Sequence, residues 1–138
     1  MSVEIRGVVE MQKGLKKMAT MDDVKQAIRV NTTEIHQKAS RRVQVDSGHL
    51  KRSLTIEFSD NGLTGRVYTD VEYGIYVEYG TGIYATGGRG RKTPWVYYNA
   101  KLGRFVQTSG MSPHPFMRPS FYEQRPKFKK DMSRLLKK

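Results

Sequence analysis

The chain has 138 residues, of which 37% are hydrophobic and none is cysteine. This length fits one domain with a core of modest size. The absence of cysteine excludes a disulfide framework, a thiolate zinc site and a cysteine nucleophile. No apolar run approaches the roughly 18 residues that a membrane-spanning helix needs, and the first residues lack the pattern of a secretion signal. We therefore expect a protein of the cytoplasm in which it is made, with no membrane partner.

The formal net charge of +12 is unevenly distributed along the chain. Residues 81–138 contain 13 Lys and Arg but only two Asp and Glu, whereas residues 48–80 contain three and five. A basic region of this size attracts either polyanions or acidic protein surfaces. Charge alone does not choose between these two classes of partner.

The first third of the chain is predicted to be mainly helical. Residues 3–5 alternate apolar and polar side chains, which predicts a short edge strand, and residues 9–18 carry an amphipathic stripe typical of a short helix. A longer helix is predicted from Thr20 to about Val43, because a capping hydroxyl precedes two carboxylates in its first turn. Its apolar face contains Met21, Val24, Ile28, Ile35 and Ala39.

The middle of the chain has the pattern of strands and turns. Residues 45–48 favour a turn that ends the helix, after which residues 54–58 and 65–69 alternate around a turn at residues 60–62 and predict a hairpin. Residues 73–79 fit either a short helical turn or a strand. The glycine-rich, basic residues 80–92 predict a mobile loop.

The last third predicts a second hairpin and a final helix. Residues 95–98 and 104–108 have the aromatic and β-branched composition of paired strands. Pro119 suits the first turn of a helix whose predicted buried stripe is Phe121, Phe128, Met132 and Leu135. Pro126 lies inside this helix and is expected to kink or split it, because proline removes a hydrogen bond and crowds the preceding turn.

Three ordered motifs carry a family resemblance that covers most of the chain. They are V-D-S-G-H-L-K-R-S at residues 45–53, Y-G-I-Y-V-E-Y-G-T at residues 73–81 and P-H-P-F-M-R-P-S at residues 113–120. In this order they resemble the tail-completion, or head–tail joining, proteins of long-tailed bacteriophages. The positions that match the family pattern with an expected structural role are Asp46, Gly48, Leu50, Ser53, Gly80, Pro115, Phe116, Arg118 and Pro119.

The resemblance implies a structural virion protein and no enzymatic activity or cofactor. Such a protein would form a homo-oligomeric ring at the neck, hexameric if it matches the symmetry of the tail. Its partners would be connector or head-completion proteins on one side and tail-terminator or tail-tube proteins on the other, with DNA passing through the lumen without specific binding. The resemblance also favours a turn running into a strand for residues 73–79.

Residues that could carry chemistry do not form a convincing site. Asp46, Ser47 and His49 are the residue types of a hydrolytic triad, but triads assemble from distant segments, and we interpret these residues as a turn. His36, His49 and His114 lack metal-ligand spacing and neighbouring carboxylates, so we predict no metal site. The glycine-rich segment fits neither nucleotide-binding motif.

The aromatic and basic middle of the chain is the candidate interface. The residues expected to contact neighbouring subunits or partners are Glu78, Tyr79, Thr81, Arg89, Arg91, Lys92 and Trp95. Glu78 fits either an arginine partner across a subunit boundary or an ordinary solvated carboxylate. The rival function is a small basic nucleic-acid-binding protein, since cations interleaved with Trp95, Tyr97 and Tyr98 could hold phosphates and stack on bases.

Together these patterns predict an α+β fold in a single domain, residues 1–138. The long helix near the N-terminus and the C-terminal helix would pack on one face of a small antiparallel sheet built from the two hairpins, with a long flexible basic loop at residues 80–92.

Overall fold

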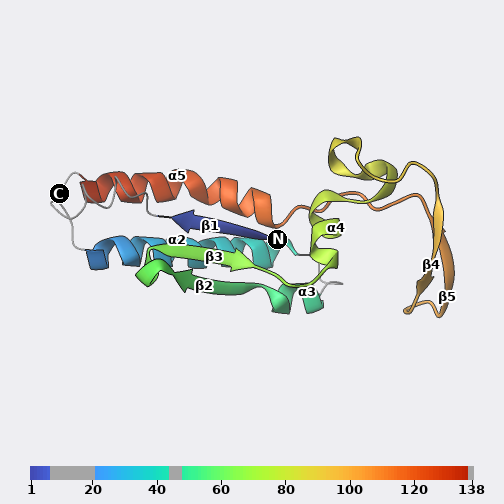
Figure 1. The fold of residues 1–138 in the computed structure, drawn as a ribbon, viewed down its shortest axis with the longest axis horizontal. Coiled ribbons are helices and arrows are strands. Elements are labelled where there is room, and N and C mark those ends of the chain that lie inside the picture. The colour runs from blue at the N-terminus through green and yellow to red at the C-terminus, as the bar shows by residue number, and fades with distance from the viewer. Residues whose placement is uncertain (7–20, 44–47, 137–138) are drawn as a thin grey trace. The chain divides into compact units, whose positions relative to one another are not determined.

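The structure is a computed structural model that describes residues 1–6, 21–43 and 48–136 (Figure 1). The chain divides into two compact units: unit 1 comprises Met1–Val71 and Phe116–Lys138, and unit 2 comprises Glu72–Pro115. The expected organisation as a single domain stays a prediction. The helix predicted over residues 9–18, the cap at Thr20 and the turn at residues 45–47 lie outside the described residues.

Helix α2, Met21–Arg42, is the longest element of unit 1 and confirms the predicted long helix. Asp22 and Asp23 lie in its first turn and Arg41 and Arg42 in its last turn, where each sign of charge complements the helix dipole. The predicted apolar face is also confirmed, because its buried residues include Val24, Ile28, Ile35 and Ala39.

A three-stranded antiparallel sheet packs against this helix. Its strands are β1 (Ser2–Arg6), β2 (Thr55–Ser59) and β3 (Thr64–Tyr68), in the order β1-β3-β2. The predicted edge strand and first hairpin are therefore confirmed, and the short turn η2, Asp60–Gly62, connects β2 to β3. On the sheet, Glu4 and Glu57 both pair with Arg66, which lies between them in the strand register.

A short helix, α3 (Gly48–Ser53), precedes β2, although the sequence predicted that the chain changes directly from a turn to strands. Its one fully buried residue, Leu50, anchors it, and the Ser53 hydroxyl donates to the Leu50 carbonyl at 2.6 Å. A single apolar anchor in six residues is too short a pattern to indicate helical periodicity.

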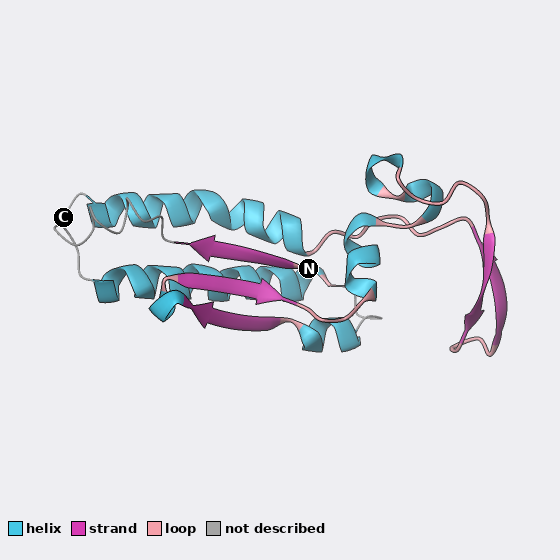
Figure 2. Ribbon diagram, viewed as in Figure 1, coloured by secondary structure: helices cyan, strands magenta, loops and turns pink. Residues whose placement is uncertain are grey.

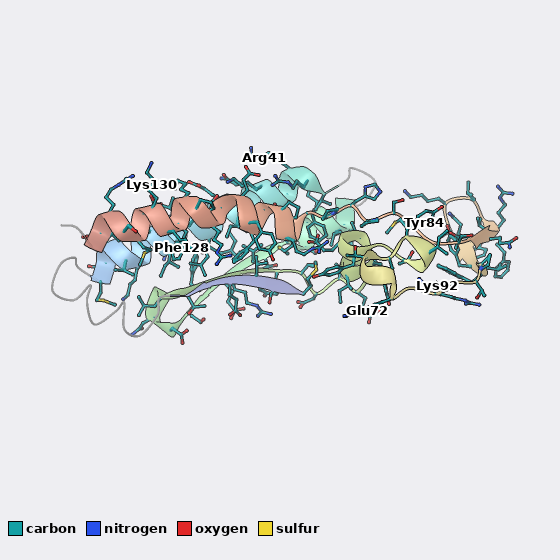
Figure 3. All side chains as sticks on the ribbon, turned by 90° about the horizontal axis from the view of Figure 1, so that it is seen from above. Arg41, Glu72, Tyr84, Lys92, Phe128 and Lys130 are labelled. Carbon is teal, nitrogen blue, oxygen red and sulfur yellow. The ribbon has the colours of Figure 1, made fainter. Side chains whose placement is uncertain are left out.

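Helix α5, Met117–Leu136, is continuous through Pro126, so the expected split does not occur. Pro126 and Tyr122, whose carbonyl would accept the missing hydrogen bond, are both exposed, and water can replace that bond. Met132 is buried, whereas Phe121, Phe128 and Leu135 are half-buried. Helices α2 and α5 form one layer and the sheet forms the other, as predicted (Figure 3).

Unit 2 contains helix α4 (Tyr73–Tyr79), two single 3-10 turns, η3 (Gly82–Tyr84) and η4 (Thr86–Gly88), and a hairpin of β4 (Trp95–Asn99) and β5 (Arg104–Thr108) (Figure 2). The second hairpin is confirmed and forms its own two-stranded sheet. The strand that the resemblance favoured within residues 73–79 is wrong, because these residues are helical. The mobility of residues 80–92 stays a prediction.

Candidate interaction groove

The end of α4 is fixed by glycine. Gly80 has a φ of 78°, which side chains other than hydrogen rarely adopt, and its N–H donates to the Tyr76 carbonyl at 2.8 Å. A Cβ atom at Gly80 would lie 2.8 Å from the carbonyl oxygen of Met111. Gly80 therefore ends the helix and also permits close approach of the chain that returns from the hairpin.

Backbone hydrogen bonds hold that returning chain against the end of α4. The Thr81 N–H donates to the Met111 carbonyl and the Met111 N–H donates to the Thr81 hydroxyl, both at 2.9 Å. The Ile83 N–H donates to the Ser109 carbonyl at 3.1 Å, and the His114 N–H donates to the Val77 carbonyl at 2.8 Å. These bonds position both ends of the glycine-rich segment.

An open groove of about 1050 Å³ lies within unit 2, and we call it the aromatic groove. Its lining comes from α4, from the two 3-10 turns and from β4. The lining residues are Ile75, Tyr76, Tyr79, Gly80, Thr81, Gly82, Ala85, Thr86, Arg89, Gly90, Arg91, Trp95 and Tyr97. Aromatic side chains thus line a groove whose charged lining residues are both arginines.

The charge of the groove is positive and is not balanced nearby in the sequence. Its two charged side chains are Arg89 and Arg91, both exposed, and residues 79–115 contain no Asp or Glu. The Arg91 guanidinium lies 5.7 Å from the centre of the Trp95 ring, a cation–π arrangement, and its Nε donates to the Thr93 hydroxyl at 3.1 Å. The groove is therefore suited to a ligand with negative and apolar groups.

Exposed apolar side chains are concentrated in unit 2. Of the 14 large hydrophobic residues that are exposed among those described, only Val30 and Tyr122 belong to unit 1. On the hairpin, Val96 is 61% exposed and Phe105 is 71% exposed, and the Phe105 ring packs only edge-on against Tyr98 at 5.4 Å. Contiguous exposed apolar groups on this scale are typical of interaction surfaces, and an isolated hairpin is only marginally stable.

Comparison with known proteins assigns the chain to a family. The family model HK97-gp10-like, described as "Bacteriophage HK97-gp10, putative tail-component", matches residues 9–80, just over half of the chain. The chain belongs to this family. The resemblance found in the sequence motifs is thereby confirmed at the level of a bacteriophage tail component. No curated protein and no solved structure matches the chain.

In this tail component, five of the seven predicted interface residues lie together. Tyr79, Thr81, Arg89, Arg91 and Trp95 all line the aromatic groove. Their role as an interface stays a prediction.

The other two predicted interface residues lie outside the lining. The ammonium group of Lys92 donates to the Gly88 carbonyl at 2.8 Å. Glu78 is completely buried, so its interpretation as a solvated carboxylate is wrong.

Two contributors to the groove, Ile75 and Tyr76, were missed by the sequence analysis. The pattern of residues 73–79 was left open between helix and strand, and each assignment places different side chains on one face. Helical spacing brings Tyr76 and Tyr79 to the same face of α4, three residues apart. Aromatic pairs at this spacing were the signal that could have identified this wall of the groove.

The motif residues of the tail-component family lie mainly at the ends of elements. Leu50 is buried in α3, and the Ser53 hydroxyl lies 2.6 Å from that of Thr69 next to β3. Gly48 begins α3, Gly80 ends α4, and Asp46 lies outside the described residues. Near α5, Pro115 is exposed, Phe116 is fully buried, and the first helical turn contains Arg118 and Pro119.

The described part of the tail component contains no cluster of three or more His, Asp or Glu residues that could hold a metal ion. His36 lies in unit 1, where its Nε2 atom is 3.0 Å from the Leu54 carbonyl, whereas His49 lies on α3 and His114 belongs to unit 2. Within the described residues no helix is both long enough and apolar enough to span a membrane.

Proposed function

We propose that the protein is a structural virion subunit that forms an oligomeric ring at the head–tail junction and joins the tail tube to the connector. Membership of a tail-component family supplies the setting. The observation that carries the proposal is the concentration of exposed apolar side chains in unit 2. Assembly surfaces that become buried in a larger complex explain such exposure, whereas an enzyme would need convergent catalytic groups.

Free sheet edges support repeated contacts between subunits. Strands β1 and β2 are the two edges of the sheet in unit 1, and β4 and β5 each have one unpaired edge in unit 2. Unpaired edges present backbone donors and acceptors to another chain. When a surface of one subunit binds a different surface of the next, rotation can close the chain of contacts into a ring, which we expect to be hexameric if it matches the tail.

The distribution of charge favours protein partners over DNA in this proposal. The basic C-terminal part of the chain would complement acidic surfaces of connector, tail-terminator or tail-tube proteins. Strong attraction at every phosphate would retain DNA in the lumen and hinder its passage. The role of the cations is therefore assembly, and the protein performs no turnover.

The decisive experiment deletes the reading frame of this protein from the phage that encodes it. We expect electron microscopy of the lysate to show filled heads and separate tails, and expression of the protein from a plasmid should restore joined particles. Normal numbers of infectious, joined virions in the deletion strain would refute the proposed function.

The nucleic-acid-binding alternative is favoured by the arginines and aromatic rings of the groove, and it makes a different prediction. Neutralising Arg89, Arg91 and Lys92 with glutamine should block joining without altering DNA binding if the protein is a neck subunit. If it is a DNA-binding protein, the same variant should lower the dependence of DNA affinity on salt by about one unit of log–log slope per lost phosphate contact. Light scattering on the same samples gives the oligomeric state.

A further inference from the structure

We infer that the aromatic groove binds an extended acidic peptide segment of a neighbouring virion protein, with apolar side chains alternating with carboxylates. This inference rests on the proposed function, because it names the kind of partner that the neck subunit receives. It goes beyond that function in assigning one groove of unit 2 to one chemical class of ligand.

The chemistry of the lining defines the ligand. Side chains of Ile75, Tyr76, Tyr79, Trp95 and Tyr97 make most of the surface apolar and aromatic. In an extended peptide, successive side chains point to opposite sides. One row of side chains can therefore enter the apolar groove while the backbone and the other row stay near its rim.

The two arginines supply the second half of the recognition. Neither Arg89 nor Arg91 forms an ion pair with a described residue, and Arg91 is held over Trp95 and bonded to Thr93. Guanidinium groups bind carboxylates with paired hydrogen bonds and lose less hydration than lysine does. Carboxylates in the outer row of the peptide would complete these two positions.

A second copy of the chain is a poor occupant of this groove. Each copy carries a net charge of +12, so copies repel one another. Most described carboxylates of unit 1 already have cationic partners within the same chain: Glu4 and Glu57 pair with Arg66, Glu34 and Asp131 with Lys127, and Glu123 with Arg42. The complementary carboxylates must therefore come from a different protein.

Nucleic acid fits the groove less well than an acidic peptide does. A groove that follows a nucleic-acid backbone needs a series of cations for successive phosphates, as well as rings that stack on bases. Only two of the 13 lining residues are cationic, and the remaining lining is uncharged. An alternating peptide needs fewer charges and more apolar contact, which matches the lining.

Fluorescence anisotropy with the full chain tests this inference directly. The probe is a fluorescein-labelled peptide of about ten residues that alternates Glu and Leu, measured near 0.15 M salt, where screening acts over about 8 Å. We expect saturable binding at least about tenfold tighter than that of an alternating Lys and Leu peptide or of an all-Glu peptide, since both charge and apolar contact contribute.

Variants separate the groove from the general charge of the protein. Arg89→Glu with Arg91→Glu should weaken peptide binding at least about tenfold, and Tyr76→Ala with Tyr97→Ala should weaken it by a similar factor. The matched control is Lys129→Glu with Lys130→Glu, which changes the net charge equally at exposed positions of α5. Circular dichroism confirms that each variant is folded, which is expected because the substituted side chains are exposed.

Three results would overturn the inference. The first is equal loss of binding in the control variant or equal binding of the all-Glu peptide, because either would indicate nonspecific attraction. The second is a ten-nucleotide oligo-dT that binds more tightly than the Glu and Leu peptide and depends on the same arginines. The third is an increase in mass on light scattering that the arginine variant abolishes, because the occupant would then be a second copy.

Failure of the inference is distinguishable from failure of the proposed function. If the peptide does not bind but the deletion phage accumulates unjoined heads and tails, the neck function stands and the acidic-peptide assignment is wrong. If the peptide binds as expected but the deletion phage forms normal virions, the groove has its ligand and the neck function is wrong.

Discussion

Gln124 connects the two long helices from a completely buried position. Its amide nitrogen donates to Asn31 Oδ1 and Glu34 Oε2, and its oxygen accepts from Lys38 Nζ, each at 2.7 Å. Replacing Gln124 with Leu keeps a similar volume but leaves the buried oxygen of Asn31 without this donor. We expect Gln124→Leu to lower the free energy of unfolding by about 1–3 kcal/mol, measured by urea denaturation.

The control for this prediction is Gln37→Leu, because Gln37 is exposed on α2 and its substitution should change stability by less than about 0.5 kcal/mol. Equal stability of the Gln124→Leu and wild-type proteins would show that the buried amide contributes nothing net. The sequence analysis did not identify this contact, since the two helices are separated by about 90 residues and a single sequence contains no information on pairing between distant polar positions.

Gly65 on β3 permits the sheet to approach α2 closely. A Cβ atom at this position would overlap the hydroxyl oxygen of Thr32, a buried residue whose hydroxyl donates to the Ile28 carbonyl at 2.7 Å. We expect Gly65→Ala to destabilise the protein by about 1–3 kcal/mol, because the short Thr32 side chain cannot move away. Thermal unfolding followed by circular dichroism measures this loss.

The comparison variant is Gly103→Ala in the turn of the second hairpin. A Cβ atom there would contact nothing within 4 Å, although the φ of 66° carries the strain of the left-handed conformation. That strain costs about 1–2 kcal/mol but involves no collision. A melting temperature for Gly65→Ala that equals the wild-type value would contradict the close approach of β3 and α2.

At the scale of elements, the pairing of α2 with α5 is sensitive to acid. The hydrogen bond from Arg42 and the charge of Lys38 hold the pKa of Glu123 below its usual value of 4.5. Partial burial raises the pKa of Asp131, but hydrogen bonds from Asn31 and Lys127 outweigh it and leave the pKa below 3.8. Both carboxylates therefore favour the folded state in their charged form.

This arrangement predicts how stability depends on pH. Because the pKa values are lower in the folded than in the unfolded chain, the stabilisation is complete above about pH 4.5 and is lost as the pH falls through the folded values. Urea denaturation between pH 6 and about pH 3 should show decreasing stability, and Glu123→Gln with Asp131→Asn should reduce that decrease. The control is Glu72→Gln, at an exposed carboxylate outside the two helices, and an unchanged pH profile in the double variant would contradict the prediction.

Elements with long or strictly alternating patterns could be predicted from the sequence, and short ones could not. Helix α2 has a sustained apolar face, and the two hairpins alternate on both sides of turn residues. Helix α4 has aromatic and β-branched residues that favour a strand, but Gly80 closes it through its bond to Tyr76 while Gly74 and Val77 are buried three residues apart. Tertiary packing therefore outweighed local propensity in these seven residues.

At the scale of the whole molecule, the sequence predicted which residues belong to the candidate site but not how they form it. Five predicted interface residues line one groove because Gly80 and Thr81 hold the returning segment near Met111. Such contacts join positions about 30 residues apart, and neither composition nor periodicity specifies them. The chemistry of the site could be read from residue types, whereas its concave shape depends on the path of the backbone.

The exposed apolar surface of unit 2 should matter for assembly rather than for folding of the subunit. Val96→Thr with Phe105→Ser removes apolar groups that are more than 60% exposed, so the free energy of unfolding should change by less than about 1 kcal/mol. The same variant, supplied from a plasmid to the deletion phage, should yield few joined particles because burial of these groups on assembly is lost.

The matched control removes exposed apolar groups from unit 1 instead, by Val30→Thr with Tyr122→Ser. Electron microscopy of the complemented lysates should show joined virions with this control and separate heads and tails with the hairpin variant. If both variants join heads to tails at wild-type levels, the hairpin does not take part in the junction. If both fail, apolar exposure acts through the whole surface, and the distinction between the two units carries no functional meaning, because assembly then depends on total apolar area rather than on where unit 2 presents it.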